Sequence, residues 1–157
     1  MPGPCWAFFR LKESDMTIAR GIRNANPGNI DYNKANDWQG QLPFDPLVES
    51  RFARFDRPEN GIRALGKLLR NYRAKYGLDT VKGLINRWAP SNENDTAAYV
   101  SAVESRIIKA TGRSAGKLDL NSPVILGCLV RAIIQHENGS IPYSDAVIDE
   151  GVRRALA

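Results

Sequence analysis

The chain has 157 residues, the size of one compact domain, and its 43% hydrophobic and 25% charged residues are typical of a folded globular protein. Its 22 Lys and Arg against 17 Asp and Glu give a net charge of +5, which favours polyanionic partners such as nucleic acid, anionic lipid or the bacterial cell wall without choosing among them. No apolar run reaches the ~18 to 20 residues of a membrane-spanning helix, so we expect no membrane span.

The first 15 residues, MPGPCWAFFRLKESD, show no helical periodicity. Their apolar stretch, Cys5–Phe9, is shorter than the ~7 to 15 residues of a signal-peptide core, so no signal peptide is expected. Met16 then opens a basic, turn-rich segment. We predict a loosely ordered extension over 1–15 and a single helical domain over 16–157.

Residues 20–57 are rich in turn signals. Asn-Pro-Gly-Asn, Trp-Gln-Gly, Leu-Pro and Asp-Pro each restrict the backbone to turns or short extended pieces. Short strands are expected at most, over 29–32 and 52–55.

From Pro58 onward, apolar residues recur at steps of three and four, as they do on one face of a helix. The first predicted helix covers 58–76 and is ended by Gly77. The second is capped by Asp79 or Thr80 and stops before Pro90, and the third is capped by Asn94 or Asp95 and reaches Gly112. The fourth runs from Ser122-Pro123 to about Glu137, and the last runs from Ser144 towards Leu156. The fourth is apolar nearly all round, which indicates a helix buried in the middle of the domain. The fold class is therefore all-α, with short strands at most.

The metal-binding residue types are scarce. His136 is the single histidine, and Cys5 and Cys128 have no metal-ligand spacing. We expect no metal and no cofactor.

Glu137 follows directly on the buried helix. Partial burial of a carboxyl group disfavours its charged form, which is how a general acid stays protonated near neutral pH. The alternative is an ordinary surface Glu, although the C-terminal turn of a helix repels negative charge.

The stretch AIIQHENG, residues 132–139, resembles the end of the catalytic helix of lysozyme-like glucosaminidases and lytic transglycosylases, whose pattern is apolar-apolar-x-x-E-S/N-G. The flagellar type of these enzymes has further motifs that NANPGNI, Trp38-Gln39-Gly40 and FARF resemble in the same order. Here the glutamate helix comes last instead of first. This resemblance implies a circularly permuted lysozyme-like fold.

A second resemblance covers most of the chain from Arg20 onward. The segments RGIRNANPGNI, FARFDRPENGIRAL and INRWAPSNENDTAAYV, together with AIIQHENG, are similar to small phage and prophage proteins described as virion or structural proteins. It implies a virion component or a prophage product, and it does not by itself imply an enzyme.

Together the resemblances imply a protein that cleaves glycosidic bonds in peptidoglycan, with Glu137 as the general acid and Asp31 as the candidate second carboxylate. Lytic transglycosylases need only one glutamate, and the substrate's N-acetyl group can replace the second carboxylate. The candidate substrate-binding residues are Asn24, Asn26, Asn29, Trp38 and Tyr99. The amides could equally be turn residues, and the aromatic rings could equally belong to the core.

Two other classes remain open: a non-catalytic virion protein with a lysozyme-like fold, and a nucleic-acid-binding protein. The second would use a basic stripe of Arg63, Lys67, Arg70 and Arg73, but no recognition motif accompanies it, which favours a solvated helix face. The expected partners are the cell-wall glycan and other virion proteins; nucleic acid is not expected. The expected location is the virion, or the bacterial cytoplasm with export by a phage route.

Overall fold

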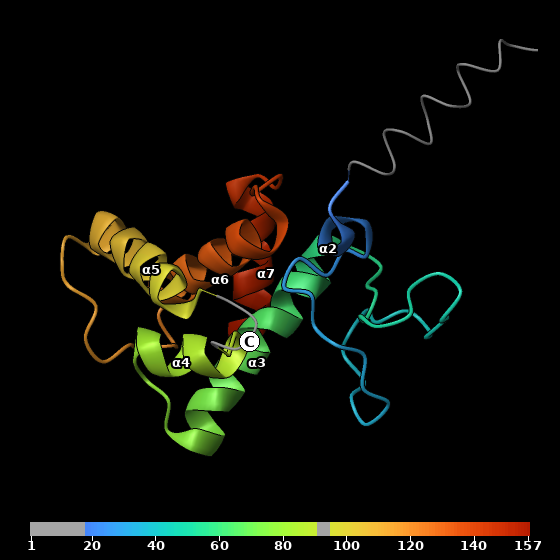
Figure 1. Ribbon diagram of the computed structural model, residues 1–157, viewed down its shortest axis with the longest axis horizontal. Coiled ribbons are helices and arrows are strands. Elements are labelled where there is room, and N and C mark those ends of the chain that lie inside the picture. The colour runs from blue at the N-terminus through green and yellow to red at the C-terminus, as the bar shows by residue number, and fades with distance from the viewer. Residues whose placement is uncertain (1–17, 91–94) are drawn as a thin grey trace, which may run out of the picture.

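The computed structural model describes residues 18–90 and 95–157, which form helices joined by loops (Figure 1). The helices are α2 (Arg20–Arg23), α3 (Pro58–Tyr76), α4 (Val81–Trp88), α5 (Thr96–Thr111), α6 (Pro123–Asn138) and α7 (Asp145–Leu156). Within these two ranges the only β pairings are two isolated bridges, Asp31 with Phe52 and Gln41 with Phe55. The all-α prediction is confirmed, and the short strands are reduced to these bridges.

Local signals set the ends of the long helices. Thr80, Asp95 and Ser122 each accept a hydrogen bond from a backbone N–H in the first turn of α4, α5 and α6, so Thr80 and Asp95 are the caps of the second and third predicted helices. The helix-ending glycines Gly77, Gly112 and Gly139 have left-handed φ values of 66°, 71° and 75°. Helix α2 was not predicted, because a helix of four residues is too short to show a period in the sequence.

The extension predicted over 1–15 lies outside the described residues. The assignment of 16–157 to a single domain stays a prediction.

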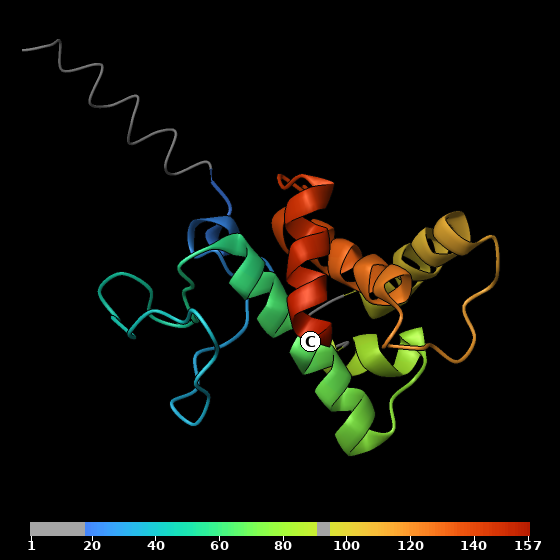
Figure 2. The same ribbon diagram turned by 180° about the vertical axis from the view of Figure 1, so that it is seen from behind.

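Helix α6 is the centre of the packing, as its apolar sequence predicts. It contacts α2, α3, α5 and α7, and residues such as Leu126, Leu129 and Ile133 are fully buried. Helices α3 and α7 lie side by side (Figure 2). Small residues allow this approach: a Cβ built on Gly66 would lie 2.6 Å from Cβ of Ala155.

The loop-rich segment, residues 24–57, projects to one side of the helices, away from α4 and α5 (Figure 1). Backbone hydrogen bonds join its two ends, from Ala53 N–H to Ile30 O at 3.0 Å and from Phe55 N–H to Asn24 O at 2.9 Å. Gly61 of α3 lies directly against the Ala25 carbonyl, where a side chain would clash. The segment is thereby held against the helices, and it forms one wall of the cleft described next.

Candidate functional site

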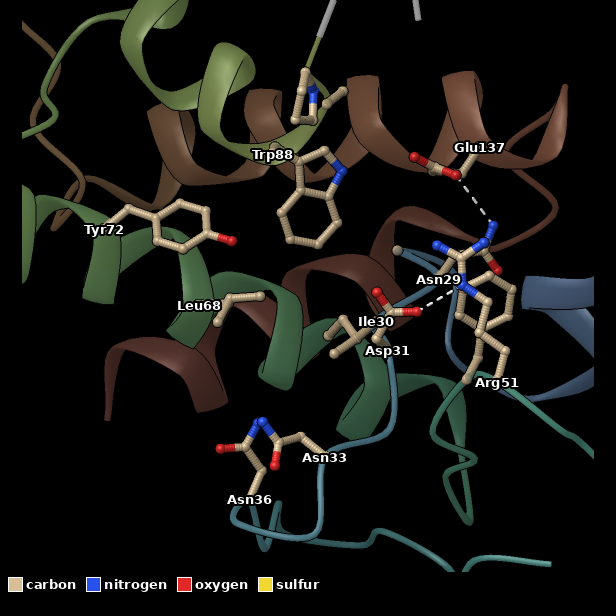
Figure 3. Close-up of a pocket in the computed structure, with 14 residues that line it drawn as sticks. Asn29, Ile30, Asp31, Asn33, Asn36, Arg51, Leu68, Tyr72, Trp88 and Glu137 are labelled. Atoms are coloured by element: carbon tan, nitrogen blue, oxygen red, sulfur yellow. Dashed lines mark hydrogen bonds and ion pairs between the residues drawn. The ribbon is translucent and has the colours of Figure 1, made fainter. Parts of the chain in front are cut away.

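A cleft of about 580 Å³ lies between the loop-rich segment and the helices (Figure 3). The helical wall consists of Leu68 and Tyr72 from α3, Trp88 from α4, Ala89 and Pro90 after it, and Glu137 from α6. The loop wall consists of Gly28, Asn29, Ile30, Asp31, Asn33, Asn36, Arg51 and Phe52. The amides, Asp31 and Arg51 of the loop wall thus face the aromatic and apolar side chains and the one carboxylate of the helical wall. This combination suits a ligand with both hydroxyl groups and apolar faces, such as a sugar.

Glu137 lies in the last turn of α6 and is half-buried at the edge of the cleft. The Asn29 side-chain amide donates to its Oε2 at 3.1 Å (Figure 3). The next residue, Asn138, donates from Nδ2 to the Pro27 carbonyl at 2.7 Å and to the Ile134 carbonyl at 3.0 Å. The end of α6 is therefore joined to the loop wall at two adjacent points, which fixes where the carboxylate lies.

The loop wall takes its shape from Asn26. Its side chain is fully buried, donates to the carbonyls of Ile30 and Ala53, and accepts from Ile30 N–H. Asn29 follows with a φ of 50°, in the left-handed region that asparagine tolerates better than most residues. Asn26 is thus used internally by the loop, whereas Asn29 reaches the cleft.

Glu49 joins the base of the loop wall to α2. It is 5% exposed and accepts two hydrogen bonds from Arg20, at 2.7 and 2.6 Å, and one from Asn24 at 3.0 Å. It also accepts from the backbone N–H groups of Arg51 and Phe52. These donors, with Arg20 first, hold the pKa of Glu49 far below its ordinary value. Glu49 was missed in the sequence because its side-chain partners, Arg20 and Asn24, lie 29 and 25 residues away along the chain.

Asp31 lies in the same cleft as Glu137, so the structure brings the two carboxylates predicted from the sequence to one site. The Asp31 carboxylate accepts from Arg51 Nε at 2.7 Å, and both side chains are largely exposed. Arg51 also lies over the Phe52 ring, 4.8 Å from its centroid. Asn24, by contrast, is 8% exposed and bonded to Glu49, away from the cleft.

The aromatic residues of the cleft are not those predicted as binders. Tyr99 is 1% exposed and its ring stacks on His136 at 3.8 Å. Burial raises the pKa of Tyr99, and the charge of Glu137 acts in the same direction. Trp38 is half-buried against the core and does not line the cleft.

The cleft is instead lined by the rings of Trp88 and Tyr72. Tyr72 was missed because it falls in the apolar stripe of α3 and resembles a core residue there.

Across residues 18–90 and 95–157, no group of three or more His, Cys, Asp and Glu side chains is arranged to hold a metal ion. None of the helices in this part of the chain is both long and apolar enough to span a bilayer.

Comparison with known proteins gives one clear relationship. No protein-family model matches the chain. A curated relative, protein P5 of Pseudoalteromonas phage PM2, is 39% identical over 137 residues, which cover 85% of this chain and 79% of the relative. An identity of this size over most of both sequences shows common descent, so the chain belongs to the family of this phage protein P5.

Proposed function

We propose that the protein is a component of a phage particle. The relationship to a phage protein over 85% of the chain supports this, as does the resemblance of its segments to phage virion proteins. The direct test is mass spectrometry of purified particles: the protein should co-purify with intact virions through a density gradient. Its absence from particles, with abundant protein in the lysate, would contradict the proposal.

We further propose that this component cleaves the glycan strands of peptidoglycan, with Glu137 as the general acid. The observation that carries this second proposal is the half-buried Glu137 at the end of α6, bonded to Asn29 across a cleft of about 580 Å³. The arrangement fits a lysozyme-like site whose glutamate helix has moved to the end of the chain by permutation.

In this mechanism the Glu137 carboxyl group gives its proton to the glycosidic oxygen as the bond between that oxygen and C1 breaks. The Asn29 amide orients the carboxyl group, and Trp88 and Tyr72 support the apolar faces of the sugar rings. Asp31 is the candidate second carboxylate. Because Arg51 already pairs with Asp31, the substrate's own N-acetyl group is the other candidate for stabilising positive charge at C1.

The substitution Glu137→Gln tests the catalytic proposal. A general acid contributes ~10² to 10⁴-fold in rate, so the variant should lose most of its lysis of purified sacculi, measured as loss of turbidity, while its fold and wall binding persist. The matched control is Glu59→Gln, which makes the same change in the first turn of α3 and outside the residues that line the cleft.

If Glu137→Gln lyses sacculi as well as the wild type does, Glu137 is not the general acid. If the wild type lyses no sacculi, the proposal of glycan cleavage fails, and a non-catalytic virion component is the better account. The particle proposal would then stand alone.

A further inference from the structure

One side of α3 carries a row of positive charges that the cleft does not use. Arg63, Lys67, Arg70 and Arg73 recur at steps of three and four residues; we call this row the basic face. Since an α-helix rises ~1.5 Å per residue, the row extends over roughly 15 Å. Leu68 and Tyr72 point from α3 to the cleft instead, so one helix serves two surfaces.

The basic face borders two hollows. The first, of about 430 Å³, lies between α3 and residues 118–121, and its lining includes Lys67, Arg70 and Arg73. The second, of about 420 Å³, is lined by Gln39, Arg63, Arg153, Arg154 and Ala157. A ligand that lies along α3 would therefore border both hollows.

The positive charge of the row is poorly compensated. No ion pair between side chains of the described residues includes a cation of the basic face, although Glu59 lies one turn before Arg63 and Asp119 lies in the first hollow. Glu150 is engaged by Arg153 and Arg154. The pKa of Lys67 is lowered by its partial burial and by the charges of Arg63 and Arg70, so these cations act on one another.

The middle of the row is also held in place. Arg70 donates to the Ala155 carbonyl at 2.8 Å and to Asn121 Oδ1 at 3.0 Å, and Lys67 donates to the terminal backbone oxygen of Ala157 at 3.2 Å. The acceptors of Arg70 are a carbonyl and an amide oxygen, which position its guanidinium group without neutralising it. Ordered cations lose less conformational entropy when an anion binds.

We propose that the basic face binds the phosphate backbone of double-stranded DNA without reading its sequence. The cations of the basic face lie in a straight row, about one turn of α3 apart. Such a row can contact several phosphates of a polymer that carries negative charges at short, regular intervals, as duplex DNA does. The phage family of the chain makes a genome an available partner. The absence of a recognition motif, which argued against nucleic acid in the sequence, excludes only base readout.

The test measures binding of a fluorescently labelled DNA duplex to the full chain by anisotropy across a salt series. Wild type should bind at about 50 mM salt, and the logarithm of its affinity should fall with the logarithm of salt with a slope near −3, as for three to four phosphate contacts. The triple variant Arg63→Gln, Lys67→Gln, Arg73→Gln should lose about tenfold or more in affinity, and its slope should become shallower by roughly 2 to 3. This triple variant keeps Arg70, because the hydrogen bonds of Arg70 join α3 to the Ala155 carbonyl of α7 and to Asn121.

The matched control is Lys109→Gln, Arg113→Gln, Lys117→Gln, which removes the same charge from exposed residues in and after α5. It should keep the wild-type slope and nearly the wild-type affinity. If the first triple variant fails to fold, as judged by circular dichroism, the single change Arg73→Glu at an exposed position should still weaken binding.

Three outcomes would overturn the proposal: no binding by wild type at low salt, equal losses in both triple variants, or displacement of DNA by phosphate-bearing lipopolysaccharide at a far lower phosphate concentration. The last would assign the basic face to an envelope glycan. None of these measurements depends on whether Glu137 is catalytic.

Discussion

At the scale of single residues, the cleft depends on a glycine that carries no chemistry. Gly21 of α2 lies beneath the junction between α6 and the loop wall. A Cβ on Gly21 would lie 2.6 Å from Asn138 Oδ1 and 2.8 Å from Asn29 Oδ1. Both asparagines would have to move, and both hold the surroundings of Glu137.

We therefore expect Gly21→Ala to lower the free energy of unfolding by about 1 to 3 kcal/mol, the usual cost of overpacking, and to weaken any activity that depends on Glu137. Urea denaturation and the sacculus assay measure the two effects. Gly116→Ala is the control, because nothing lies within 4 Å of the added methyl group. An unchanged stability for Gly21→Ala would show that the asparagines are not held as described.

The asparagines also show where prediction from the sequence stopped. Asn24, Asn26 and Asn29 look alike in the sequence, and all three were predicted to bind a sugar. Only Asn29 lines the cleft; Asn24 is bonded to Glu49, and Asn26 to a carbonyl 27 residues away. Because these bonds depend on distant partners, nothing local distinguishes the three.

At the scale of elements, the helices were predicted well because their signals are local. A cap such as Ser122, a glycine such as Gly139 and the apolar spacing between them lie within one helix. Packing between helices is different, since the contact of α3 with α7 joins residues almost 90 positions apart, as in the bond of Arg70 to the Ala155 carbonyl.

The close approach of α3 and α7 leads to a swap experiment. Gly66→Ala should gain ~1 kcal/mol from helix propensity, yet we expect it to destabilise the protein, because the new methyl group would collide with Cβ of Ala155. Adding Ala155→Gly removes that collision. The double variant should therefore melt at a higher temperature than Gly66→Ala alone, although Ala155→Gly by itself lowers helix propensity. A Gly66→Ala protein more stable than wild type would contradict this packing.

At the scale of the whole molecule, the cleft joins parts of the chain that are far apart: Asn29 and Glu137 are separated by 108 positions. Only the resemblance to lysozyme-like enzymes led to the prediction that Asn29 and Glu137 belong to one site. The sequence did not predict the anchor that holds the loop wall to α2. That anchor is the buried cluster around Glu49.

The anchor makes the stability of the protein depend on pH. The pKa of Glu49 is depressed in the folded state, whereas an ordinary Glu in an unfolded chain titrates near 4.3. As the pH falls, the unfolded chain therefore becomes protonated at Glu49 before the folded protein does. The contribution of Glu49 is therefore complete above about pH 5 and declines as the pH falls below the unfolded value. Glu150, whose pKa is lowered to about 2 by Arg153 and Arg154, acts in the same direction.

Comparison with Glu49→Gln isolates the effect of Glu49, because Glu150 is the same in both proteins. At neutral pH the variant should be less stable by about 2 to 3 kcal/mol, since Arg20 loses its ionic partner and buried N–H donors lose an acceptor. The difference between the two proteins, measured by urea denaturation at a series of pH values, should stay constant from pH 8 to about pH 5 and shrink below it. A difference that persists unchanged to pH 3 would mean that the ionised form of Glu49 does not stabilise the fold, and that the loop wall is held by packing and backbone hydrogen bonds instead.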